Sequence, residues 1–401
     1  MTIAVYLVSR RELLYTAPEV LAWAREHVHV LTATPLNRLA EDVRAALGSE
    51  AGPVALTLAR LWWKNREKFP TWREFIADSE GSEQASGERP ARWRAARFAG
   101  RGMVLDLCCG AGADTIALSL TAQHVVAVDW NMARLRWARA NVERYGTAAH
   151  SRFLCADVQC HLPAADAVLL DPDRRSSGRR AVSPRRASPP PEVWEGIRAR
   201  TTGLAVKTAP GIPYDEIPPD AVPEFVEDRG ECREAVLWFG DLRLSARTAT
   251  VLSGGHDDEP LRGESITAGE PETHAVGEVG TVIYDPGPAT VRAHLITHLA
   301  TRLGAWRVDE RIAYLSGDRV VLTPFAAAFR VEEVWPFHLR RIKSALRERK
   351  IGALEIRTRR FPISPEELRR QFALSGERQA TLIFTKIHDH PVAILCGRVV
   401  E

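Results

Sequence analysis

Apolar residues recur along the first hundred residues with the period of an amphipathic helix. Three stretches carry this period, and each is bounded by Pro or Gly, which commonly begin or end helices. The predicted helices open at Ala17-Pro18, run from Leu36 to Leu47 before Gly48, and run from Leu56 to Phe69 before Pro70. Residues 78–90, DSEGSEQASGERP, are polar and rich in Gly and Ser, which is typical of a loop or hinge. The pattern therefore predicts a helical N-terminal domain over residues 1–90.

From Met103 the pattern changes to short apolar runs, bounded by Gly, Asp or Pro, that alternate with helical stretches. This alternation is typical of a parallel sheet covered by helices. The predicted strands are Val104–Cys108, Val125–Asp129, Arg152–Cys155, Ala167–Leu170 and Leu204–Lys207, and the predicted helices are Asp114–Leu120 and Met132–Tyr145, the second capped by Asn131. Glu234–Phe239 and Arg247–Leu252, joined through Gly240-Asp241, are predicted to close the sheet as an antiparallel pair. We therefore expect an α/β domain with a Rossmann-like, seven-stranded sheet over residues 91–255.

The rest of the chain mixes short helices and strands without a repeating order. Residues 253–280 are rich in Gly and acidic residues and are predicted to form a linker. Beyond them the predicted helices are Thr290–Leu303, Pro336–Arg349 and Pro365–Phe372, and the predicted strands are Arg319–Leu322, Ala353–Arg357, Ala380–Ile387 and Val392–Val399. The pattern favours a small α+β module over residues 323–401, preceded by a connecting segment at 281–322.

The chain has 401 residues, 45% of them apolar and 26% charged, which is the composition of a soluble protein with two or three domains. No run of about eighteen apolar residues occurs, and the apolar stretch near Met1 is too short for a signal peptide, so no membrane partner and a cytoplasmic location are expected. The net charge of +3 conceals a basic C-terminal region, because residues 323–401 contain fifteen Lys and Arg against nine Asp and Glu. Arginine is common throughout the chain, so basic runs alone are weak evidence for nucleic-acid binding.

No metal site is expected. The six cysteines form no CxxC pair, and the group Cys155, Cys160 and His161 lacks a second pair of ligands. Reduced thiols are the simpler interpretation.

The strongest chemical signal is the segment Val104–Thr115, VLDLCCGAGADT, in which a buried strand runs into a Gly-x-Gly turn that opens a helix. Gly110 and Gly112 allow the backbone to turn tightly and to approach a ligand. Either a dinucleotide or S-adenosylmethionine uses such a loop. The dinucleotide fingerprint has a glycine where this chain has Thr115, and Asp106 within the strand suits the cationic amino-acid end of S-adenosylmethionine. The sequence therefore predicts S-adenosylmethionine as the cofactor.

Further candidate cofactor-binding residues follow the next two predicted strands. Asp129 is placed to accept both ribose hydroxyls, Trp130 to stack on adenine, and Asp157 to accept from the adenine amino group. Cys108 and Asp114, in the glycine loop itself, complete the candidate set. Any one acid alone could be an ordinary turn residue, but acids at successive strand ends form a correlated pattern.

The segment DLCCGAGADTIALSL resembles the first motif of class I methyltransferases, particularly those of the trimethylguanosine-synthase branch. Over a longer span the chain is similar to bacterial methyltransferases that carry a C-terminal THUMP-like domain. The residues that carry this similarity are Lys68–Pro70, Ser82–Ser86, Trp93–Phe98, Asp171–Arg175, Val206–Pro210, Pro286–Thr301 and Gly352–Arg360. The resemblance implies methyl transfer from S-adenosylmethionine, a ferredoxin-like connecting segment, and RNA as a partner.

The candidate acceptor site lies after the fourth predicted strand. Methyltransferases that modify amino or ring nitrogens commonly carry [DN]-P-P-[YFW] there, and this chain has Asp171-Pro172-Asp173-Arg174. Asp171 and Pro172 match, so Asp171 can orient a nitrogen nucleophile, while Asp173 is a candidate proton acceptor and the stacking aromatic is missing. Lys207, at the end of the fifth strand, is either a charge partner for the acceptor or an ordinary strand-end lysine. The absence of a cysteine nucleophile in this region argues against the covalent route to 5-methylpyrimidines.

Candidate RNA-binding residues are arginines at two places. Arg174 and Arg175 lie beside the candidate acceptor acid, where paired guanidiniums suit phosphate. Arg340, Arg341, Arg357 and Arg359 are candidates for a basic face of the C-terminal module. The sequence therefore predicts a methyltransferase acting on a base nitrogen, guanine or adenine, of rRNA or tRNA. A methyltransferase for a protein or small molecule, and a catalytically silent RNA-binding protein that retains the fold, are the alternatives.

Overall fold

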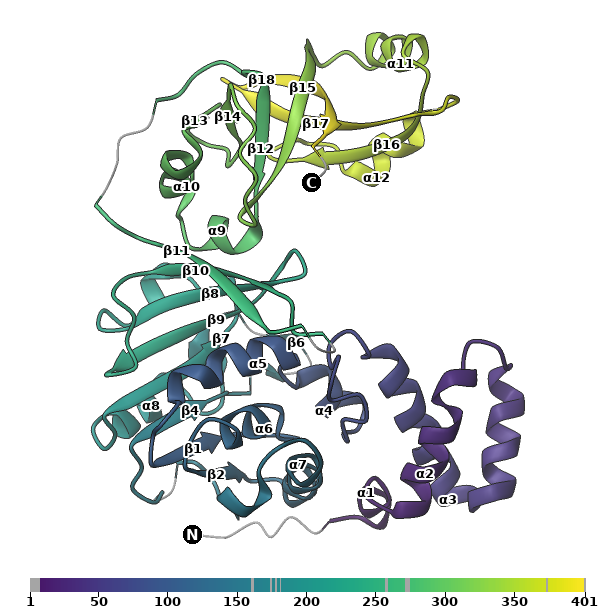
Figure 1. Cartoon of the computed structure of the whole chain (residues 1–401), viewed down its shortest axis with the longest axis vertical. Helices are drawn as coiled ribbons and strands as arrows, with labels where there is room; N and C mark the ends of the chain where they lie inside the picture. Colours follow the sequence, from purple (N-terminus) through teal and green to yellow (C-terminus); the bar gives the residue numbers. More distant parts are fainter. Residues whose placement is uncertain are drawn as a thin grey trace. The chain divides into compact units, whose positions relative to one another are not determined.

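The computed structural model describes residues 8–159, 162–173, 175–176, 179–180, 182–256, 259–270, 275–372 and 374–399. The chain forms two compact units: the first is Met1–Ser245 with Leu252–Gly263, and the second is Ala246–Val251 with Glu264–Glu401. Figure 1 shows both units, with labels on most helices and strands. The division into four domains stays a prediction, and its first boundary, at residue 90, falls inside the helix α5 (Glu88–Ala95).

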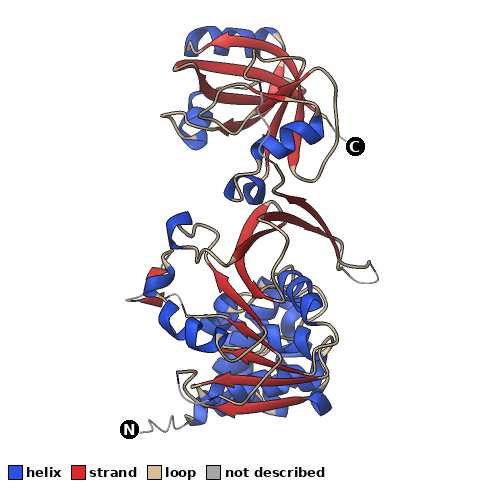
Figure 2. Cartoon of the chain, turned by 90° about the vertical axis from the view of Figure 1, so that its left-hand side faces the viewer, coloured by secondary structure: helices blue, strands red, loops and turns tan. Residues whose placement is uncertain are grey.

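A mixed sheet forms the centre of the first unit, and Figure 2 shows its strands fanning with a pronounced twist. Its strands are β1 (Met103–Leu107), β2 (His124–Asp129), β3 (Ser151–Cys155), β4 (Ala167–Leu170), β7 (Gly203–Thr208), β8 (Val222–Asp228) and β9 (Glu231–Gly240), in the order β8-β9-β7-β4-β1-β2-β3. β3, β2, β1, β4 and β7 are parallel, whereas β9 is antiparallel to both of its neighbours. The expected Rossmann-like, seven-stranded fold is confirmed; β10 (Thr248–Ser253) and β11 (Arg262–Thr267) extend the order to nine strands.

The register of β1 with its two neighbours places the carboxyl ends of β1, β2 and β4 side by side. Leu107 pairs with Val128 of β2 on one side and with Leu170 of β4 on the other. The strand order reverses between β1 and β4, which is where sheets of this type bind their ligands. The strands are buried on both faces, and this explains their nearly continuous apolar sequences.

Two helices follow β1 and β2 and pack against the sheet. α6 (Ala113–Ser119) begins directly after the glycine loop, and α7 (Met132–Tyr145) has the predicted bounds. The side chain of Asn131 accepts hydrogen bonds from the backbone N–H groups of Ala133 and Arg134 at 2.9 and 3.2 Å, so the predicted cap is confirmed. A third helix, α8 (Pro191–Arg198), precedes β7. Short segments complete this part of the chain: the 3-10 turns Ala148–His150, Pro184–Arg186 and Tyr214–Glu216, and the two-residue strands β5 (Arg175–Ser176) and β6 (Arg179–Arg180).

The N-terminal helices share one apolar core with the sheet. They are α1 (Arg10–Leu14), α2 (Pro18–His27), the 3-10 turn Val28–Val30, and α3 (Leu36–Lys64). Gly48 breaks α3 with a φ of 80°, at the position where the sequence predicts a stop. The third predicted helix is wrong at both ends: it starts before Leu56 and ends at Lys64, because Asn65 already leaves helical geometry.

The polar segment 78–90 is not the loop that its composition predicts. It forms α4 (Ser79–Gln84) and the start of α5, which continues through the 3-10 turn Ala96–Phe98. The Asp78 side chain caps α4 by accepting a hydrogen bond from the Gly81 N–H at 2.7 Å. Ser82, Ser86, Glu88 and Arg89 are buried. These four side chains therefore bond to the protein rather than to water.

Two further predictions in this region are wrong. Glu234–Phe239 belongs to β9, which pairs with β7 and β8 and not with the strand at Arg247–Leu252. The buried strand β8 was not predicted, because its sequence, VPEFVED, contains a proline and three acids. Inside the protein Glu224 accepts a hydrogen bond from Trp238, and Asp228 forms an ion pair with Arg89. β11 lies within residues 253–280, which the composition predicts to be a linker.

The second unit contains a seven-stranded sheet with helices, so the expected α+β character is confirmed. Its strands are β12 (Val282–Pro286), β13 (Trp306–Arg307), β14 (Leu315–Gly317), β15 (Ala326–Pro336), β16 (Ile351–Thr358), β17 (Arg378–Ile387) and β18 (His390–Arg398), in the order β13-β14-β12-β15-β18-β17-β16. Its helices are α9 (Pro288–Arg292), α10 (Ile296–Leu303), α11 (Leu339–Glu348) and α12 (Pro365–Gln371). The predicted helix Thr290–Leu303 is interrupted at His294, whose φ is 52°, and Arg319–Leu322 is not a strand.

Candidate active site

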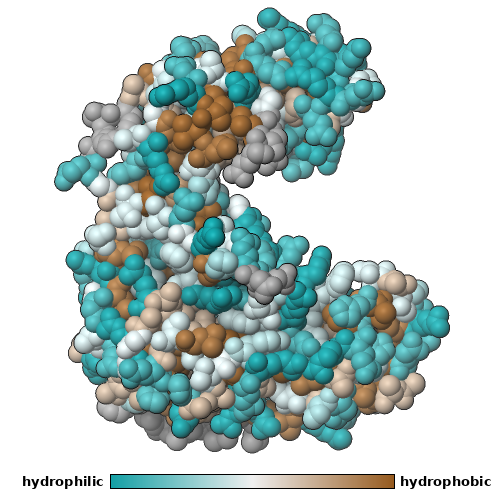
Figure 3. All heavy atoms as spheres, in the orientation of Figure 1, coloured by the Kyte–Doolittle hydropathy of each residue, from teal (hydrophilic) through white to brown (hydrophobic). Residues whose placement is uncertain are grey.

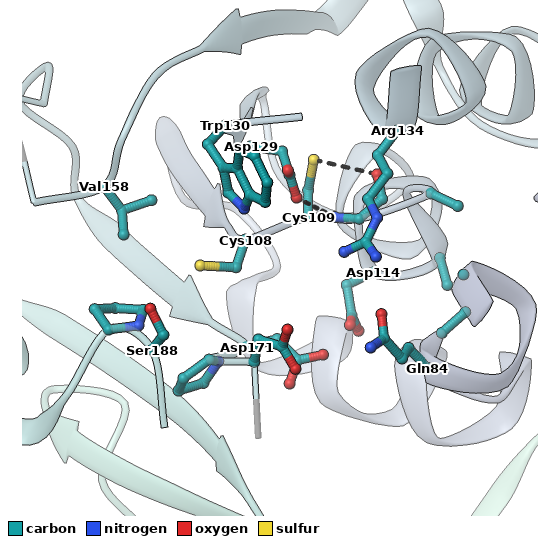
Figure 4. Close-up of a pocket in the computed structure, with 18 of the residues that line it drawn as sticks. Gln84, Cys108, Cys109, Asp114, Asp129, Trp130, Arg134, Val158, Asp171 and Ser188 are labelled. Carbon is teal, nitrogen blue, oxygen red and sulfur yellow. Dashed lines mark hydrogen bonds between the residues drawn. The ribbon is translucent and has the colours of Figure 1, made fainter. Parts of the chain in front are cut away.

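A cavity of about 310 Å³ opens at the carboxyl ends of β1, β2 and β4. Its size lies at the lower end of the range for small-molecule sites. The glycine loop, the end of β2, the segment after β3 and the residues after β4 form its walls, together with α4 and the Ser188-Pro189 pair (Figure 4). The predicted site residues that line it are Cys108, Gly110, Asp114, Asp129, Trp130, Asp157, Asp171, Pro172 and Asp173. The structure thus brings together most of the candidate cofactor and catalytic residues.

The glycine loop follows the wall of the cavity with three residues in the left-handed region. Cys108, Gly110 and Gly112 have φ values of 60°, 55° and 86°. A Cβ on Gly112 would lie 2.8 Å from both Cα and Cβ of Ala138 in α7, so only glycine fits there. Gly110 turns its backbone N–H toward Asp129 and donates to Oδ2 at 2.9 Å. The loop therefore presents main chain, not side chains, to part of the cavity.

Asp129 ends β2 with its carboxylate at the cavity wall and only 3% of the residue exposed. It accepts two backbone hydrogen bonds, from Gly110 and, at 2.8 Å, from Asn131. Burial raises the pKa of this carboxyl, while the two N–H donors act in the opposite direction. A carboxylate has about four acceptor positions. Two of them remain for a ligand with paired hydroxyl groups.

Trp130 and Asp157 lie on the more open part of the wall. Trp130 is 61% exposed, and Figure 4 shows its indole beside Val158 at one end of the cavity. The exposed Asp157 uses Oδ1 to accept a hydrogen bond from the Gln159 N–H at 2.9 Å. Both residues therefore occupy positions suited to a flat, nitrogen-bearing ring.

Asp106 lies beneath the cavity and not on its wall. The residue is fully buried, and its Oδ2 accepts a hydrogen bond from the Thr115 hydroxyl at 2.5 Å. Its Oδ1 has no partner among the described residues. Burial, and then the nearby Asp114 carboxylate, raise the pKa of Asp106 above its ordinary value. The direct contact with a ligand that the sequence suggests is therefore not available in this arrangement.

Asp114 and Lys207 belong to a buried charge network on the side of the cavity nearest β4 and β7. Asp114 accepts hydrogen bonds from Lys207 at 3.0 Å, from the Ser86 hydroxyl at 2.8 Å, and from Arg94. Lys207 also forms an ion pair with Asp171. Burial alone would raise the pKa of Asp114, but the charges of Arg94 and Lys207 hold it well below its usual range. Lys207 does not line the cavity, yet it links two residues that do.

Several lining residues were not predicted from the sequence. Gly81, Gln84, Ala85 and Ser86 come from the segment that was expected to be a loop, and Ser188 and Pro189 lie opposite Asp173 in a two-stranded bridge. Arg134 comes from the first turn of α7, and Figure 4 shows it facing the same end of the cavity as Gln84. Arg134 could have been predicted from the sequence, because it follows the predicted cap Asn131 by one helical turn, at the end of a predicted strand. For residues 81–86 the signal was the family similarity over Ser82–Ser86, which did not indicate that they line a cavity.

Comparison with known proteins places the chain in a family. It is 36% identical over 334 residues to an uncharacterised S-adenosylmethionine-dependent methyltransferase of Mycobacterium tuberculosis strain H37Rv, a match that covers 80% of this chain and 89% of that protein. A protein of the same description from strain CDC 1551 matches to the same extent. The chain belongs to this family of S-adenosylmethionine-dependent methyltransferases.

Family models match two parts of the methyltransferase. The model described as RNA cap guanine-N2 methyltransferase matches residues 101–172, and the model described as THUMP domain-like matches residues 326–398. The resemblance seen in the sequence is thereby confirmed. A crystal structure of a proposed methyltransferase from Porphyromonas gingivalis W83 is similar over 98% of this chain and 100% of its own, with a TM-score of 0.73 and 20% identity. At this identity the likeness shows a shared fold.

The candidate RNA-binding arginines of the methyltransferase fall into three groups. Arg174 and the side chain of Arg175 lie outside the described residues. Arg340 and Arg341 are exposed on α11, in a part of the second unit where hydrophilic side chains gather (Figure 3). Arg357 and Arg359 both bind Asp285, at 2.5 Å from Nη1 and 2.7 Å from Nε. The last two guanidiniums are therefore already engaged within the unit.

Neither a membrane span nor a metal cluster occurs in the part of the chain that the structure describes. No helix there is long and apolar enough to cross a bilayer. The same residues contain no group of three His, Cys, Asp or Glu side chains able to hold a metal ion. Cys160 and His161, two of the three residues considered as a cluster in the sequence, lie outside the described residues.

Proposed function

We propose that the enzyme transfers a methyl group from S-adenosylmethionine to a base nitrogen, of guanine or adenine, in structured RNA such as rRNA or tRNA. The observation that carries the proposal is the position of Asp171, which follows β4 and lines the same cavity as Asp129. The family-model match to guanine-N2 methyltransferases over residues 101–172 supports a nitrogen acceptor, and the THUMP-like match supports RNA. A cytoplasmic location stays part of the proposal.

The cavity fits an adenosine cofactor with a charged amino-acid end. We infer that Asp129 accepts both ribose hydroxyls, Trp130 stacks on the adenine, and Asp157 accepts from its amino group. At Cys108 and Gly110 the main chain turns toward the cofactor, and no bulky side chain separates it from the cofactor. At the other end Arg134 and Gln84 face the cavity. Arg134 is suited to the carboxylate of the methionine moiety, because a guanidinium binds carboxylates in a planar, two-point geometry.

The chemistry requires a neutral amine aimed at an electrophilic methyl group, which S-adenosylmethionine supplies when it is bound. Asp171 accepts a hydrogen bond from the amine, which turns the nitrogen lone pair toward the methyl group. As the nitrogen–carbon bond forms, the bond between the methyl carbon and the donor sulfur breaks and leaves a neutral thioether, and the nitrogen then carries one proton too many. Asp173, exposed at the mouth of the cavity, is placed to pass this proton to water. Pro172 fixes the backbone between the two acids.

Two variants test the cofactor and acceptor roles separately. Asp129→Ala should weaken S-adenosylhomocysteine binding by about 1.5–3 kcal/mol for each charge-assisted hydrogen bond removed, measured by calorimetric titration. Asp171→Ala should leave that affinity nearly intact and lower methyl transfer by roughly a hundredfold or more. Glu143→Ala, an exposed acid on α7, is the matched control and should change neither quantity. Equal affinity for Asp129→Ala, or full activity for Asp171→Ala, would remove the corresponding assignment.

Mass spectrometry of RNA nucleosides identifies the acceptor. Cells that lack the protein should lose one methylated guanine or adenine from rRNA or tRNA. If all RNA methylation is unchanged and the purified enzyme labels a protein or a small molecule instead, the RNA assignment is wrong while the cofactor assignment stands. If the protein binds the cofactor and labels no cellular fraction, that result favours the alternative of a catalytically silent RNA-binding protein that retains the fold.

A further inference from the structure

Lys207 lies at the end of β7 with 5% of its side chain exposed, and each of its ammonium hydrogens has an acceptor. The acceptors are the Ser86 hydroxyl at 2.5 Å, Oδ2 of Asp114 at 3.0 Å, and Oδ2 of Asp171. An ammonium group has three N–H donors and no more. The three contacts come from three separate segments: the turn after α4, α6, and the residues after β4. The ammonium therefore has one favourable position.

Ser86 is equally saturated. Its hydroxyl donates to Asp114 at 2.8 Å and accepts from Lys207 and, at 3.1 Å, from Nη2 of Arg94. A hydroxyl has one donor and two acceptor positions. Arg94 itself is 1% exposed and forms ion pairs with Asp114 and Glu234. The buried turn between α4 and α5 thus holds the ammonium in place through a fixed set of hydrogen bonds.

The contact with Lys207 leaves Asp171 with one oxygen for the cavity. Oδ2 is taken by the ammonium, and Oδ1 has no hydrogen bond among the described residues. About a quarter of the side chain is exposed, on the cavity side. A carboxylate fixed in this way can accept a hydrogen bond at Oδ1 along one direction. It cannot rotate to offer its other oxygen without breaking a buried ion pair.

We propose that Lys207 is a positioning residue which, held by Ser86 and Asp114, fixes Asp171 as a hydrogen-bond acceptor aimed at the amine of the methyl acceptor. The inference rests on the proposed function, because it assigns Asp171 to an amine. It adds a division of labour. Asp171 orients the amine through Oδ1, while Oδ2 stays in contact with the Lys207 ammonium. The excess proton leaves by another route, for which Asp173 and water are at hand.

The charges around Asp171 support this division. The groups that face it are Lys207 on β7, Arg94 on α5, Asp114 on α6, Asp106 on β1, Cys108 in the glycine loop and Asp173 in its own segment, with Glu234 on β9 beyond Arg94. Among the described residues Lys207 is the cation in contact with Asp171, whereas Asp106 and Asp114 are acids. Burial lowers the pKa of Lys207, but Asp114 and Asp171 raise it above its ordinary value. Removal of Lys207 would leave Asp171 beside other acids and favour its protonation.

The test is the pH dependence of methyl transfer. Total RNA from cells that lack the protein serves as the substrate, with radiolabelled S-adenosylmethionine. In Lys207→Met the acidic limb of the kcat profile should move to higher pH by at least one unit, and activity should partly recover at alkaline pH. Lys207→Arg keeps the charge, so its rate should fall but its acidic limb should stay at the wild-type pH. S-adenosylhomocysteine affinity, measured in parallel, should change by less than about threefold in both variants.

Each outcome separates this inference from the proposed function. Equal loss of activity at every pH in Lys207→Met, with cofactor affinity retained, would show that Lys207 only stabilises the fold. A shift of the acidic limb in Lys207→Arg as well would contradict the charge-based role. If the wild-type protein did not bind S-adenosylhomocysteine, or if Asp171→Ala kept full activity, the proposed function would be overturned instead.

A second variant covers the case in which Lys207→Met does not fold. Ser86→Ala keeps every charge of the network and removes only one acceptor of the ammonium. It should lower kcat several-fold without changing the KM for RNA or the position of the acidic limb. An unchanged kcat would show that the position of Lys207 is not critical, and the inference would fall.

Discussion

Each unit of the methyltransferase contains a group of oppositely charged side chains, and the two groups differ in burial. In the first unit Arg94, Asp114 and Lys207 are 1%, 7% and 5% exposed. In the second unit Arg357 and Arg359 flank Asp285 but keep 32% and 29% of their side chains exposed. The first group lies between segments far apart in the sequence, from α5 to β7. The second connects β12 with the end of β16, which are not neighbours in their sheet, and it remains partly exposed to water.

The difference shows that burial, and not the number of charges, decides what a charged segment does. A buried ion must keep every partner, because an unpaired charge in a low-dielectric interior costs several kcal/mol. A partly exposed pair contributes little, since water replaces a missing partner. The buried network should therefore be sensitive to single changes, whereas a single change in the partly exposed group should cost little stability.

The largest expected effect comes from removing the most buried cation. Arg94→Met should lower the free energy of unfolding by about 3–5 kcal/mol, because Asp114 and Glu234 lose a buried partner. Urea denaturation measures it. Arg101→Met is the matched control in the same unit, because Arg101 and Asp241 are 25% and 44% exposed, and it should cost no more than about 1 kcal/mol. Similar costs for the two variants would show that burial does not separate the networks.

An intermediate effect is expected on the affinity for RNA, and it tests which arginines of the second unit contact phosphates. The double variant Arg340→Gln with Arg341→Gln should weaken binding of tRNA and rRNA and flatten the dependence of log K on log salt by about one for each phosphate that is no longer neutralised. The matched pair Arg357→Gln with Arg359→Gln should change the slope less, because both guanidiniums are held by Asp285. Fluorescence anisotropy across a series of KCl concentrations measures both. A reversed order would show that Asp285 releases its arginines to RNA.

The smallest effect on stability is expected when one of the two arginines that contact Asp285 is removed. Arg357→Gln should lower the free energy of unfolding by about 0–1 kcal/mol, since Asp285 keeps Arg359 as a partner. Thermal unfolding of the full chain measures it, with Arg378→Gln, another partly exposed pair in the second unit, as the control. If the free energy of unfolding fell as much as is expected for Arg94→Met, the Asp285 group would contribute to stability as strongly as the buried network.

The sequence predicts well those features that depend on local pattern. Apolar runs identify β1, β2, β4 and β7, and the cap at Asn131 and the turn at Gly110 and Gly112 follow from short-range stereochemistry. Asp129 and Asp171 were predicted as site residues because each ends a strand whose position in the sheet could be inferred; their roles stay predictions. Both residues line the cavity, as the pattern requires.

Features that depend on tertiary contacts were not predictable in this way. Residues 78–90 have the composition of a solvated loop, but Ser86 and Glu88 find buried partners more than ten residues away. β8 was missed because buried acids interrupt its apolar pattern. Asp106 was expected at the ligand because it stands in the strand before the turn, yet its side chain bonds to Thr115 below the cavity. Sequence pattern gives the position of such a residue along a strand but not the partner its side chain will choose.

The thiol of Cys108 lies in the cavity wall at the turn of the glycine loop. Burial, followed by the carboxylates of Asp129, Asp171 and Asp106, raises the pKa of this thiol well above its ordinary value. The thiolate, not the thiol, is the nucleophilic form of cysteine, and a methyl sulfonium would alkylate a thiolate within reach. The acidic surroundings that suit a cationic cofactor thus also keep this thiol in its protonated, less nucleophilic form. A sulfur atom can remain in the wall of a methyl-transfer cavity without becoming its substrate.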